Sequence, residues 1–315
     1  MQTCDSKYGT IKGIIQCTYF ENGSIRECIV NRYNELCTPC GTFVPQFESS
    51  GIRKKNINSM TFYKSGVLKS ISLQEQTFVK TSIGELPAEL LTFYESGAIK
   101  RLFPLNGKIS AYWTEEDEYG LAEEYTFNIG SLSLKSRING IYFYESGKIK
   151  SVTLWPDETL EDRSPLGRVN IRTGISFYAD GKIKSLEPSD ILPVKTPIGT
   201  IAAYDSRSNG INGDNNSLKF YNDGAVQSLI TSTDIVTVTD SNGKMHIFGP
   251  KIQPSIMETE NTAVIPMRME FFDGFVSFAG STVKYEIGKC AFSIRHYPQY
   301  LSLGCSDCSK CTMCG

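Results

Sequence analysis

The ten cysteines of this 315-residue chain gather at its two ends. Five lie within the first 40 residues and five within the last 26, and the 249 residues between Cys40 and Cys290 contain none. The chain ends in GCSDCSKCTMCG, over residues 304–315, where two residues separate each cysteine from the next: Cys305, Cys308, Cys311 and Cys314. Because exposed thiols are a liability, such a run indicates a site at which thiolates bind a metal.

The spacing of this run favours an iron–sulfur cluster. Three cysteines in a row suit three corners of a [4Fe–4S] cluster. The run resembles the bacterial ferredoxin pattern C-x2-C-x2-C-x3-C-P, with Cys305, Cys308 and Cys311 in matching places. It departs from that pattern at the end, where Cys314 follows after two residues and Gly315 replaces proline. The fourth ligand is therefore either Cys314 or the more remote Cys290.

Zinc is the alternative metal. CTPCG at 37–41 and CTMCG at 311–315 both look like the C-x2-C-G knuckles of zinc ribbons, and two knuckles make a Cys4 site. However, CTPCG also matches a turn sequence that recurs elsewhere without cysteine. A third interpretation is a metal-free tail that binds a partner or is redox-active.

The sequence offers little support for an enzyme. We find no nucleophile elbow, P-loop, dinucleotide fingerprint or H-E-x-x-H motif. Of the two histidines, we interpret His246 as a surface or packing residue and His296 as a core or loop residue. The net charge of −2 predicts no attraction to nucleic acid. Neither a signal peptide nor an apolar stretch of about 18 residues is present, so we expect a soluble cytoplasmic protein without a membrane span.

One phrase recurs along the chain and predicts how it folds. FYESGKIKS at 143–151 returns at 62–70, 93–101, 177–185 and 220–228, and more loosely at 19–27. In each copy, apolar residues alternate up to the first aromatic residue of the phrase. Two polar residues and a glycine come after the aromatic pair, and an apolar residue stands two places after the glycine. This order is typical of a β-hairpin with a three-residue loop and a left-handed glycine. The register should pair Phe143 with Ile149, and should place Cys17 beside Cys28 in the first hairpin.

A second motif marks the other ends of the hairpins. KTSIGEL (80–86), RSPLGRV (163–169), KTPIGTI (195–201) and LCTPCGTF (36–43) read as return turns. The predicted fold is therefore all-β, an elongated and twisted antiparallel meander of repeated hairpins with few helices. We expect a repeat array over 1–250, a β cap over 251–303 and a metal-binding tail over 304–315. A further hairpin is predicted around Gly107, pairing Phe103 with Ile109, and a solvated loop over 115–118.

A basic residue stands three places after the glycine in five copies of the phrase. In a regular stack these residues form a stripe along one face. The stripe could bind an acidic partner or lipid headgroups, or it could be a solvated face on which lysines prevent aggregation. The residues are Arg26, Lys69, Lys100, Lys150 and Lys184.

The phrase resembles the variant MORN repeat, in which an aromatic pair, two polar residues, a glycine and an apolar–lysine pair build successive hairpins. The resemblance covers residues 18–230 in patches. It implies an antiparallel sheet of stacked hairpins, and MORN proteins are interaction scaffolds, some of this variant class being antitoxin components. We therefore expect a non-catalytic scaffold subunit of a larger assembly, with a metal centre in its tail. The alternatives are a metal-free protein-binding module of the antitoxin or adaptor type, and a zinc-stabilised scaffold.

Overall fold

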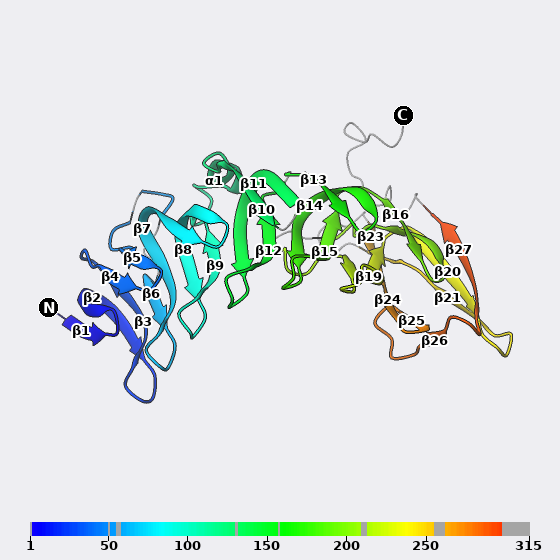
Figure 1. Cartoon of the computed structure of the whole chain (residues 1–315), viewed down its shortest axis with the longest axis horizontal. Helices are drawn as coiled ribbons and strands as arrows, with labels where there is room; N and C mark the ends of the chain where they lie inside the picture. Colours follow the sequence, from blue (N-terminus) through cyan, green and yellow to red (C-terminus); the bar gives the residue numbers. More distant parts are fainter. Residues whose placement is uncertain are drawn as a thin grey trace. The chain divides into compact units, whose positions relative to one another are not determined.

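The computed structural model describes residues 2–49, 51–54, 58–129, 132–156, 158–208, 213–254 and 262–297 (Figure 1). Antiparallel strands dominate these residues, and α1 (Glu115–Tyr119) is the one helix among them. This confirms the prediction of an all-β fold with little helix. The chain divides into two compact units, unit 1 with residues 1–158 and 179–181, and unit 2 with residues 159–178 and 182–315. The expected boundaries near 250 and 303 stay predictions.

Unit 1 is built on one antiparallel succession of strands. The strands that pair one after another are β1 (Gln2–Ser6), β2 (Gly9–Tyr19), β3 (Ile25–Val30), β6 (Met60–Phe62), β7 (Leu68–Thr81), β8 (Gly84–Phe93), β9 (Ile99–Phe103), β11 (Leu132–Phe143) and β12 (Ile149–Leu154). β10 (Glu124–Ile129) also pairs with β11, and β4 (Leu36–Thr38) pairs with β5 (Gly41–Phe43).

Unit 2 repeats this plan and adds smaller sheets. Its main succession is β13 (Leu160–Ser164), β14 (Gly167–Phe177), β15 (Ile183–Pro188), β18 (Leu218–Phe220), β19 (Val226–Thr231), β24 (Met267–Phe272), β25 (Phe275–Phe278) and β26 (Tyr285–Glu286). The smaller sheets pair β16 (Leu192–Thr196) with β17 (Gly199–Ala203), β22 (Lys251–Pro254) with β23 (Thr262–Ile265), and β20 (Asp234–Thr239) with both β21 (Met245–Phe248) and β27 (Ala291–His296).

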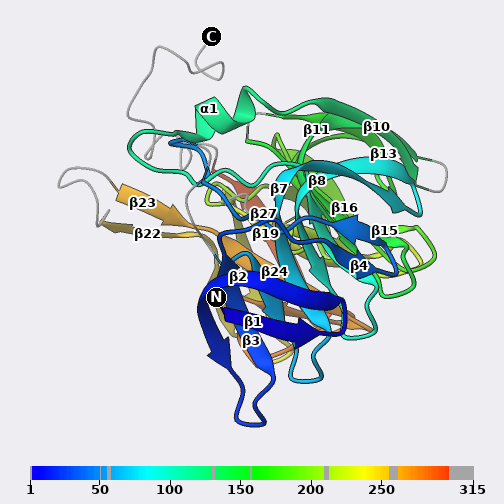
Figure 2. The same cartoon turned by 90° about the vertical axis from the view of Figure 1, so that its left-hand side faces the viewer.

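The recurring phrase forms the predicted hairpin in every copy. Phe143 pairs with Ile149, the Tyr144 amide donates to the Lys148 carbonyl at 2.7 Å, and the Gly147 amide donates to the Tyr144 carbonyl at 2.9 Å. The six phrase glycines have φ between +79° and +90°, which confirms the left-handed corner. The four turns of unit 1 project along one edge, and α1 lies at the opposite end of the unit (Figures 1 and 2).

Each hairpin also contains a β-bulge beside its turn. Tyr142 pairs with Ser151 while Phe143 pairs with Ile149, which leaves Lys150 as the extra residue. The same register shift occurs in the other five hairpins. A bulge increases the local twist and turns the side chain of the extra residue. All five basic residues of the predicted stripe occupy this bulge position.

The return turns share a side-chain hydrogen-bond pattern. Thr81 donates its hydroxyl to the Gly84 carbonyl at 2.7 Å and accepts the Ile83 amide at 3.3 Å. Thr38 and Cys40 repeat these two contacts in the first copy, so CTPCG is a return turn. The same pattern recurs at Ser6, Ser164 and Thr196.

The return turns fold back against the phrase turns, and the apolar residues lie between these two layers. The Cys40 thiol lies 3.6 Å from the Gly97 carbonyl oxygen, and the Ser82 hydroxyl donates to the Gly147 carbonyl at 2.6 Å. Phe43 packs on Phe93 with 6.3 Å between ring centroids. The long strands bend where their register shifts, as between Ser72 and Thr77 of β7. The β7–β8 pair is therefore an arch around a buried core.

Two predictions near α1 are wrong. Phe103 pairs with Leu90, and Ile109 is 57% exposed, so no hairpin forms around Gly107. The acidic run forms α1, and its Glu118 side chain is buried. Glu118 accepts the Gly107 amide at 2.6 Å, because a glycine lets the carboxylate approach closer than any Cβ would. Glu118 also accepts two hydrogen bonds of 2.8 Å from Arg53, which offset the cost of burying its charge.

The phrase glycine can be tested by Gly147→Ala. A Cβ here would meet open space, so only the positive φ opposes it, and we expect a loss of about 1–2 kcal/mol in the free energy of unfolding. Gly120→Ala is the matched control in the same unit, since Gly120 has φ −58°. Urea unfolding measures both. An equal effect of the two changes would contradict the left-handed corner.

Candidate functional site

The second aromatic residue of the phrase, a tyrosine, ties four of the hairpins to the next. The Tyr63 hydroxyl donates to the Phe93 carbonyl at 2.8 Å, and Tyr94 does the same to Phe143 at 2.8 Å. In unit 2, Tyr178 donates to Phe220 at 2.8 Å and Tyr221 to Phe271 at 2.7 Å. This role was not predicted from the sequence, although the tyrosine that follows the phenylalanine in five copies of the phrase was a signal for it.

The predicted basic stripe lies on these tyrosines. The ammonium groups of Lys69, Lys100, Lys150 and Lys184 lie 5.8, 5.5, 5.6 and 5.5 Å from the ring centroids of their own hairpins' tyrosines. Arg26 is exposed beside a hairpin that has a phenylalanine in this place. A cation over an aromatic ring at an exposed site contributes about 0.5–1 kcal/mol. The lysines therefore have a structural task, and their binding of an acidic partner stays a prediction.

The cysteines divide between packing sites and the tail. Cys17 pairs with Cys28 as predicted, and burial together with Cys17 raises the pKa of Cys28 to about 12. Cys290 lies just before β27, where burial and the carboxylates of Asp240 and Glu286 raise its pKa. Cys305, Cys308, Cys311 and Cys314 lie outside the described residues. Within the described residues, no three metal-ligating side chains form a group that could hold an ion.

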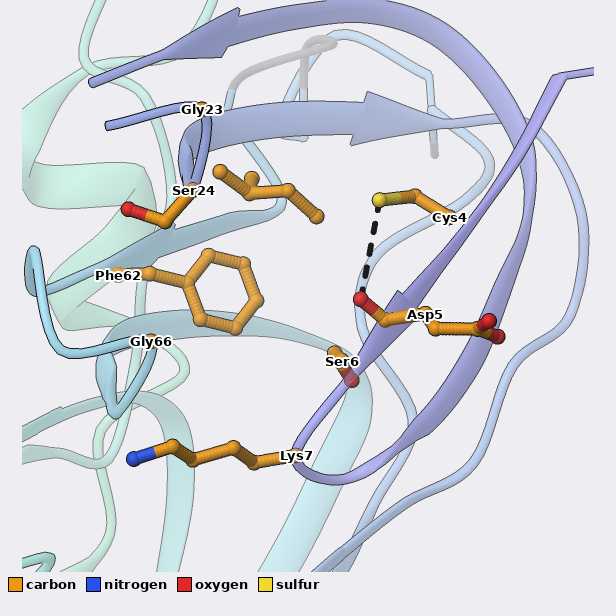
Figure 3. Close-up of a pocket in the computed structure, with 9 residues that line it drawn as sticks. Cys4, Asp5, Ser6, Lys7, Gly23, Ser24, Phe62 and Gly66 are labelled. Atoms are coloured by element: carbon orange, nitrogen blue, oxygen red, sulfur yellow. Dashed lines mark hydrogen bonds between the residues drawn. The ribbon is translucent and has the colours of Figure 1, made fainter. Parts of the chain in front are cut away.

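A cavity of about 350 Å³ opens beside β1 (Figure 3). Phe62 and Ile25 line it, and the Lys7 side chain lies 3.6 Å from the place of a Cβ on Gly66. The Asp5 carboxylate points away from Phe62 and accepts the Thr10 hydroxyl at 2.7 Å. The Asp5 carboxylate and the Lys7 ammonium group thus do not converge on the cavity. We interpret the cavity as the space between the return turn at Ser6 and the phrase turns at Gly23 and Gly66.

A second and better candidate is the pair of Asp234 and His296 in unit 2. Nδ1 of His296 lies 2.5 Å from Oδ1 of Asp234. Asp234 begins β20 and is fully buried, whereas the His296 side chain at the end of β27 is 53% exposed. A buried carboxylate that holds an exposed imidazole is an arrangement used for metal ligands and for proton transfer. The alternation Asp234, Val236, Val238 could have placed this aspartate on the buried face.

The other histidine has a packing environment, as predicted. Nε2 of His246 lies 3.2 Å from Oδ2 of Asp240, and its ring lies 5.4 Å from that of Tyr285. Phe248, two residues further on in β21, stacks on Phe278 with 4.5 Å between centroids. His246 therefore belongs to the aromatic cluster that β21 forms with β25 and β26.

A buried carboxylate in unit 2 has an unusual titration. Glu187 is 1% exposed and accepts the Ser217 amide at 2.7 Å and the Ser217 hydroxyl at 2.8 Å. Its cation, Arg172, is 3.9 Å away. Burial raises the pKa of Glu187 to about 7, and these contacts only partly oppose the rise. The loop that contains Ser217 is thus anchored to β15 by a group that titrates near neutrality.

Comparison with known proteins gives no relative. No family model matches the chain, and no curated protein or solved structure matches it. Among the described helices, none is long and apolar enough to cross a membrane.

The tyrosine contact can be tested by Tyr63→Phe, which keeps the ring and its contact with Lys69. The Phe93 carbonyl loses its donor, so we expect a loss of about 1 kcal/mol in the free energy of unfolding. Tyr112→Phe is the control, because Tyr112 is 77% exposed. Both are measured by urea unfolding. A loss no larger than that of the control would show that the hydrogen bond does not stabilise the stack.

Glu187 should make stability depend on pH in an unusual direction. The folded state keeps the proton up to about pH 7, while the unfolded chain releases it near its ordinary pKa of 4.5. The free energy of unfolding should therefore fall as pH rises from about 4.5 to 7, by on the order of 3 kcal/mol from this group.

The measurement is urea unfolding of the wild type and Glu187→Gln at pH 5 and pH 8. The variant lacks this titration, so its stability relative to the wild type should increase with pH. Glu161→Gln, in the exposed pair with Arg168, is the control and should show no such trend. A constant difference between Glu187→Gln and the wild type would refute the assignment.

Proposed function

We propose that this protein is a non-catalytic β-hairpin scaffold that binds a metal centre, first of all a [4Fe–4S] cluster, through its C-terminal cysteines. One observation carries the scaffold: each recurring residue of the phrase has a structural task. The phenylalanine packs in the core, the tyrosine binds the next hairpin, the glycine makes the corner and the basic residue occupies the bulge. A repeated unit whose recurring residues all have structural tasks serves to build a platform.

The metal centre is proposed from the tail sequence. Cys305, Cys308 and Cys311 have the spacing that suits three irons of a [4Fe–4S] cluster, with Cys314 or Cys290 as the fourth cysteine ligand. Such a centre would serve electron transfer or would fix the tail within a larger assembly. Zinc held by the same thiolates is the alternative, since tetrahedral thiolate sites stabilise small segments. The resemblance to MORN repeats supports the scaffold role.

A metal-free protein-binding module, of the antitoxin or adaptor type, is the second candidate. It is favoured by the alignment of Lys69, Lys100 and Lys150 at the same position of successive hairpins in unit 1. A row of cations on rings would suit an acidic face of a protein partner. In this case partner binding should survive removal of residues 304–315.

The test is anaerobic purification of the full chain, followed by visible absorption and assays of iron, sulfide and zinc. We expect a brown protein with iron and sulfide, and loss of both in Cys305→Ser/Cys308→Ser. Cys37→Ser is the control, because Cys37 is an exposed thiol of a return turn. A colourless protein with about one zinc per chain would support the zinc alternative. A metal-free wild type would refute the metal centre.

A further inference from the structure

We propose that Cys17 and Cys28 are a redox-active dithiol, which a hydroperoxide oxidises to a cross-strand disulfide in the first phrase hairpin. The inference is independent of the proposed metal centre, because it uses none of the C-terminal cysteines. It is carried by the register of β2 and β3, by the residues that the other hairpins have in the same places, and by the contacts of the Cys17 sulfur.

The register places the two thiols where neighbouring strands approach each other closely. Cys17 is the Cα partner of Cys28. The Phe20 amide donates to the Ser24 carbonyl at 2.8 Å. Pairs with and without ladder hydrogen bonds alternate from there, so Cys17 and Cys28 form a non-hydrogen-bonded pair, with Cα atoms about 4.5 Å apart. A disulfide requires a Cα separation of about 4.4–6.8 Å, so this pair meets the backbone requirement.

No other copy of the phrase has cysteines in these two places. The first hairpin also has Tyr19, whose side chain is 47% exposed, where five copies have a buried phenylalanine. Packing alone needs only aliphatic side chains at the two cysteine positions, so it does not explain two thiols beside an exposed tyrosine. The equivalent buried pairs are Met60 with Ile71, Leu91 with Leu102, Ile141 with Val152, and Ile175 with Leu186.

The contacts of the Cys17 sulfur make Cys17 the thiol that reacts first. Cys17 is half-buried, whereas Cys28 is 1% exposed. Burial raises the pKa of Cys17, but hydrogen bonds from the Tyr19 hydroxyl and the Cys28 thiol oppose this rise, because they stabilise the thiolate. Burial and Cys17 raise the pKa of Cys28 to about 12, so Cys28 keeps its proton. Its thiol already contacts the sulfur that it must attack.

The reaction removes two electrons from the two thiols. The Cys17 thiolate attacks one oxygen of the hydroperoxide, so that an S–O bond forms and the O–O bond breaks. The leaving alkoxide takes the proton of Cys17 and becomes an alcohol, or water if the oxidant is hydrogen peroxide. The Cys28 sulfur then attacks the sulfenic acid, an S–S bond forms, and hydroxide leaves with the Cys28 proton as water. A small thiol reverses the change by thiol–disulfide exchange.

Cys4 is the third thiol of this cluster and the competing partner. Besides burial, Cys4 contributes to the raised pKa of both Cys17 and Cys28, which places it near them. However, the Cα partner of Cys4 is Ile11, so the register gives Cys17 a directly opposed thiol only in Cys28. In the part of the chain that the structure describes, the three thiols do not form a group that could hold an ion.

The test is oxidation of the reduced full chain, freed of metal by a chelator, with hydrogen peroxide. Alkylation, trypsin digestion and mass spectrometry follow. Cleavage after Lys12, Arg26 and Arg32 leaves Cys17 on the peptide 13–26 and Cys28 on the peptide 27–32. We expect these two peptides to be joined by a disulfide and to separate again after reduction. With Cys28→Ser, Cys17 should stop at the sulfenic acid, which dimedone captures.

Tyr19→Phe tests Tyr19 as a positioning residue. It restores the phenylalanine of the other copies and removes one donor from the Cys17 sulfur. Because the thiolate is the reacting species, the oxidation should be several-fold slower at pH 8, and its pH profile should move to higher pH. The disulfide should still form, and circular dichroism should show an intact β fold.

Met60→Cys/Ile71→Cys is the matched control. It adds the same cross-strand pair to the second hairpin, where both positions are fully buried. In one chain the two pairs compete for the same hydrogen peroxide. The Cys17–Cys28 pair should be oxidised at least tenfold faster, because its reacting thiol is accessible and hydrogen-bonded.

The outcomes decide the inference separately from the metal centre. A Cys17–Cys28 disulfide in the wild type and in Cys305→Ser/Cys308→Ser/Cys311→Ser/Cys314→Ser supports the dithiol, whether or not the tail binds metal. The inference is overturned if Cys17 joins Cys4 instead, or if it is oxidised to the sulfinic acid while Cys28 stays reduced. Equal rates for the native and the added pair would overturn the role given to the surroundings of Cys17.

Discussion

The pairing of a phenylalanine with the apolar residue six positions later is the constraint on which this architecture depends. Phe143 must reach Ile149 across a loop of three residues, and the chain closes that loop only with a left-handed residue at Gly147. The pairing also forces Lys150 out of register as a bulge. The left-handed corner, the bulge and the burial of the phrase phenylalanines are thus consequences of one cross-strand contact that is repeated along the chain.

Local rules made much of this fold predictable. Alternation and turn chemistry were sufficient for the phrase hairpins, the return turns and the contact of Cys17 with Cys28, because each involves residues close in sequence. These rules failed at Gly107, where a sequence typical of a turn instead contacts Glu118. Glu118 is itself bound by Arg53, which is 65 residues away in the sequence. The tyrosine contacts and the bent strands were equally out of reach, because they depend on how one hairpin meets another.

The candidate site shows the same limit. The cysteine run is visible in the sequence, whereas the partner of His296 is 62 residues away and is known only once β20 and β27 are paired. Two other buried carboxylates, those of Glu89 and Glu187, also bind residues distant in the sequence, but their charged surroundings differ. Glu89 bonds Arg53 and lies 3.2 Å from Lys54, whereas Glu187 has its arginine at 3.9 Å and relies on Ser217. The cation nearest to Glu187 is thus farther from its carboxylate than the cations beside Glu89, and burial raises the pKa of Glu187 to about 7.

The contacts of the return turns extend beyond the neighbouring hairpin. The turn at Ser82 meets Gly147 and passes over the hairpin of Gly97, the turn at Cys40 meets Gly97 and passes over that of Gly66, and Pro165 meets Gly224 beyond Gly181. In a simple solenoid each repeat touches only its immediate neighbours and can be lost or gained singly. Here the hairpins of Gly66, Gly97 and Gly181 are each bridged by a segment that belongs to other hairpins. Within each unit, the loss of one of these three hairpins would therefore also break the contact that spans it.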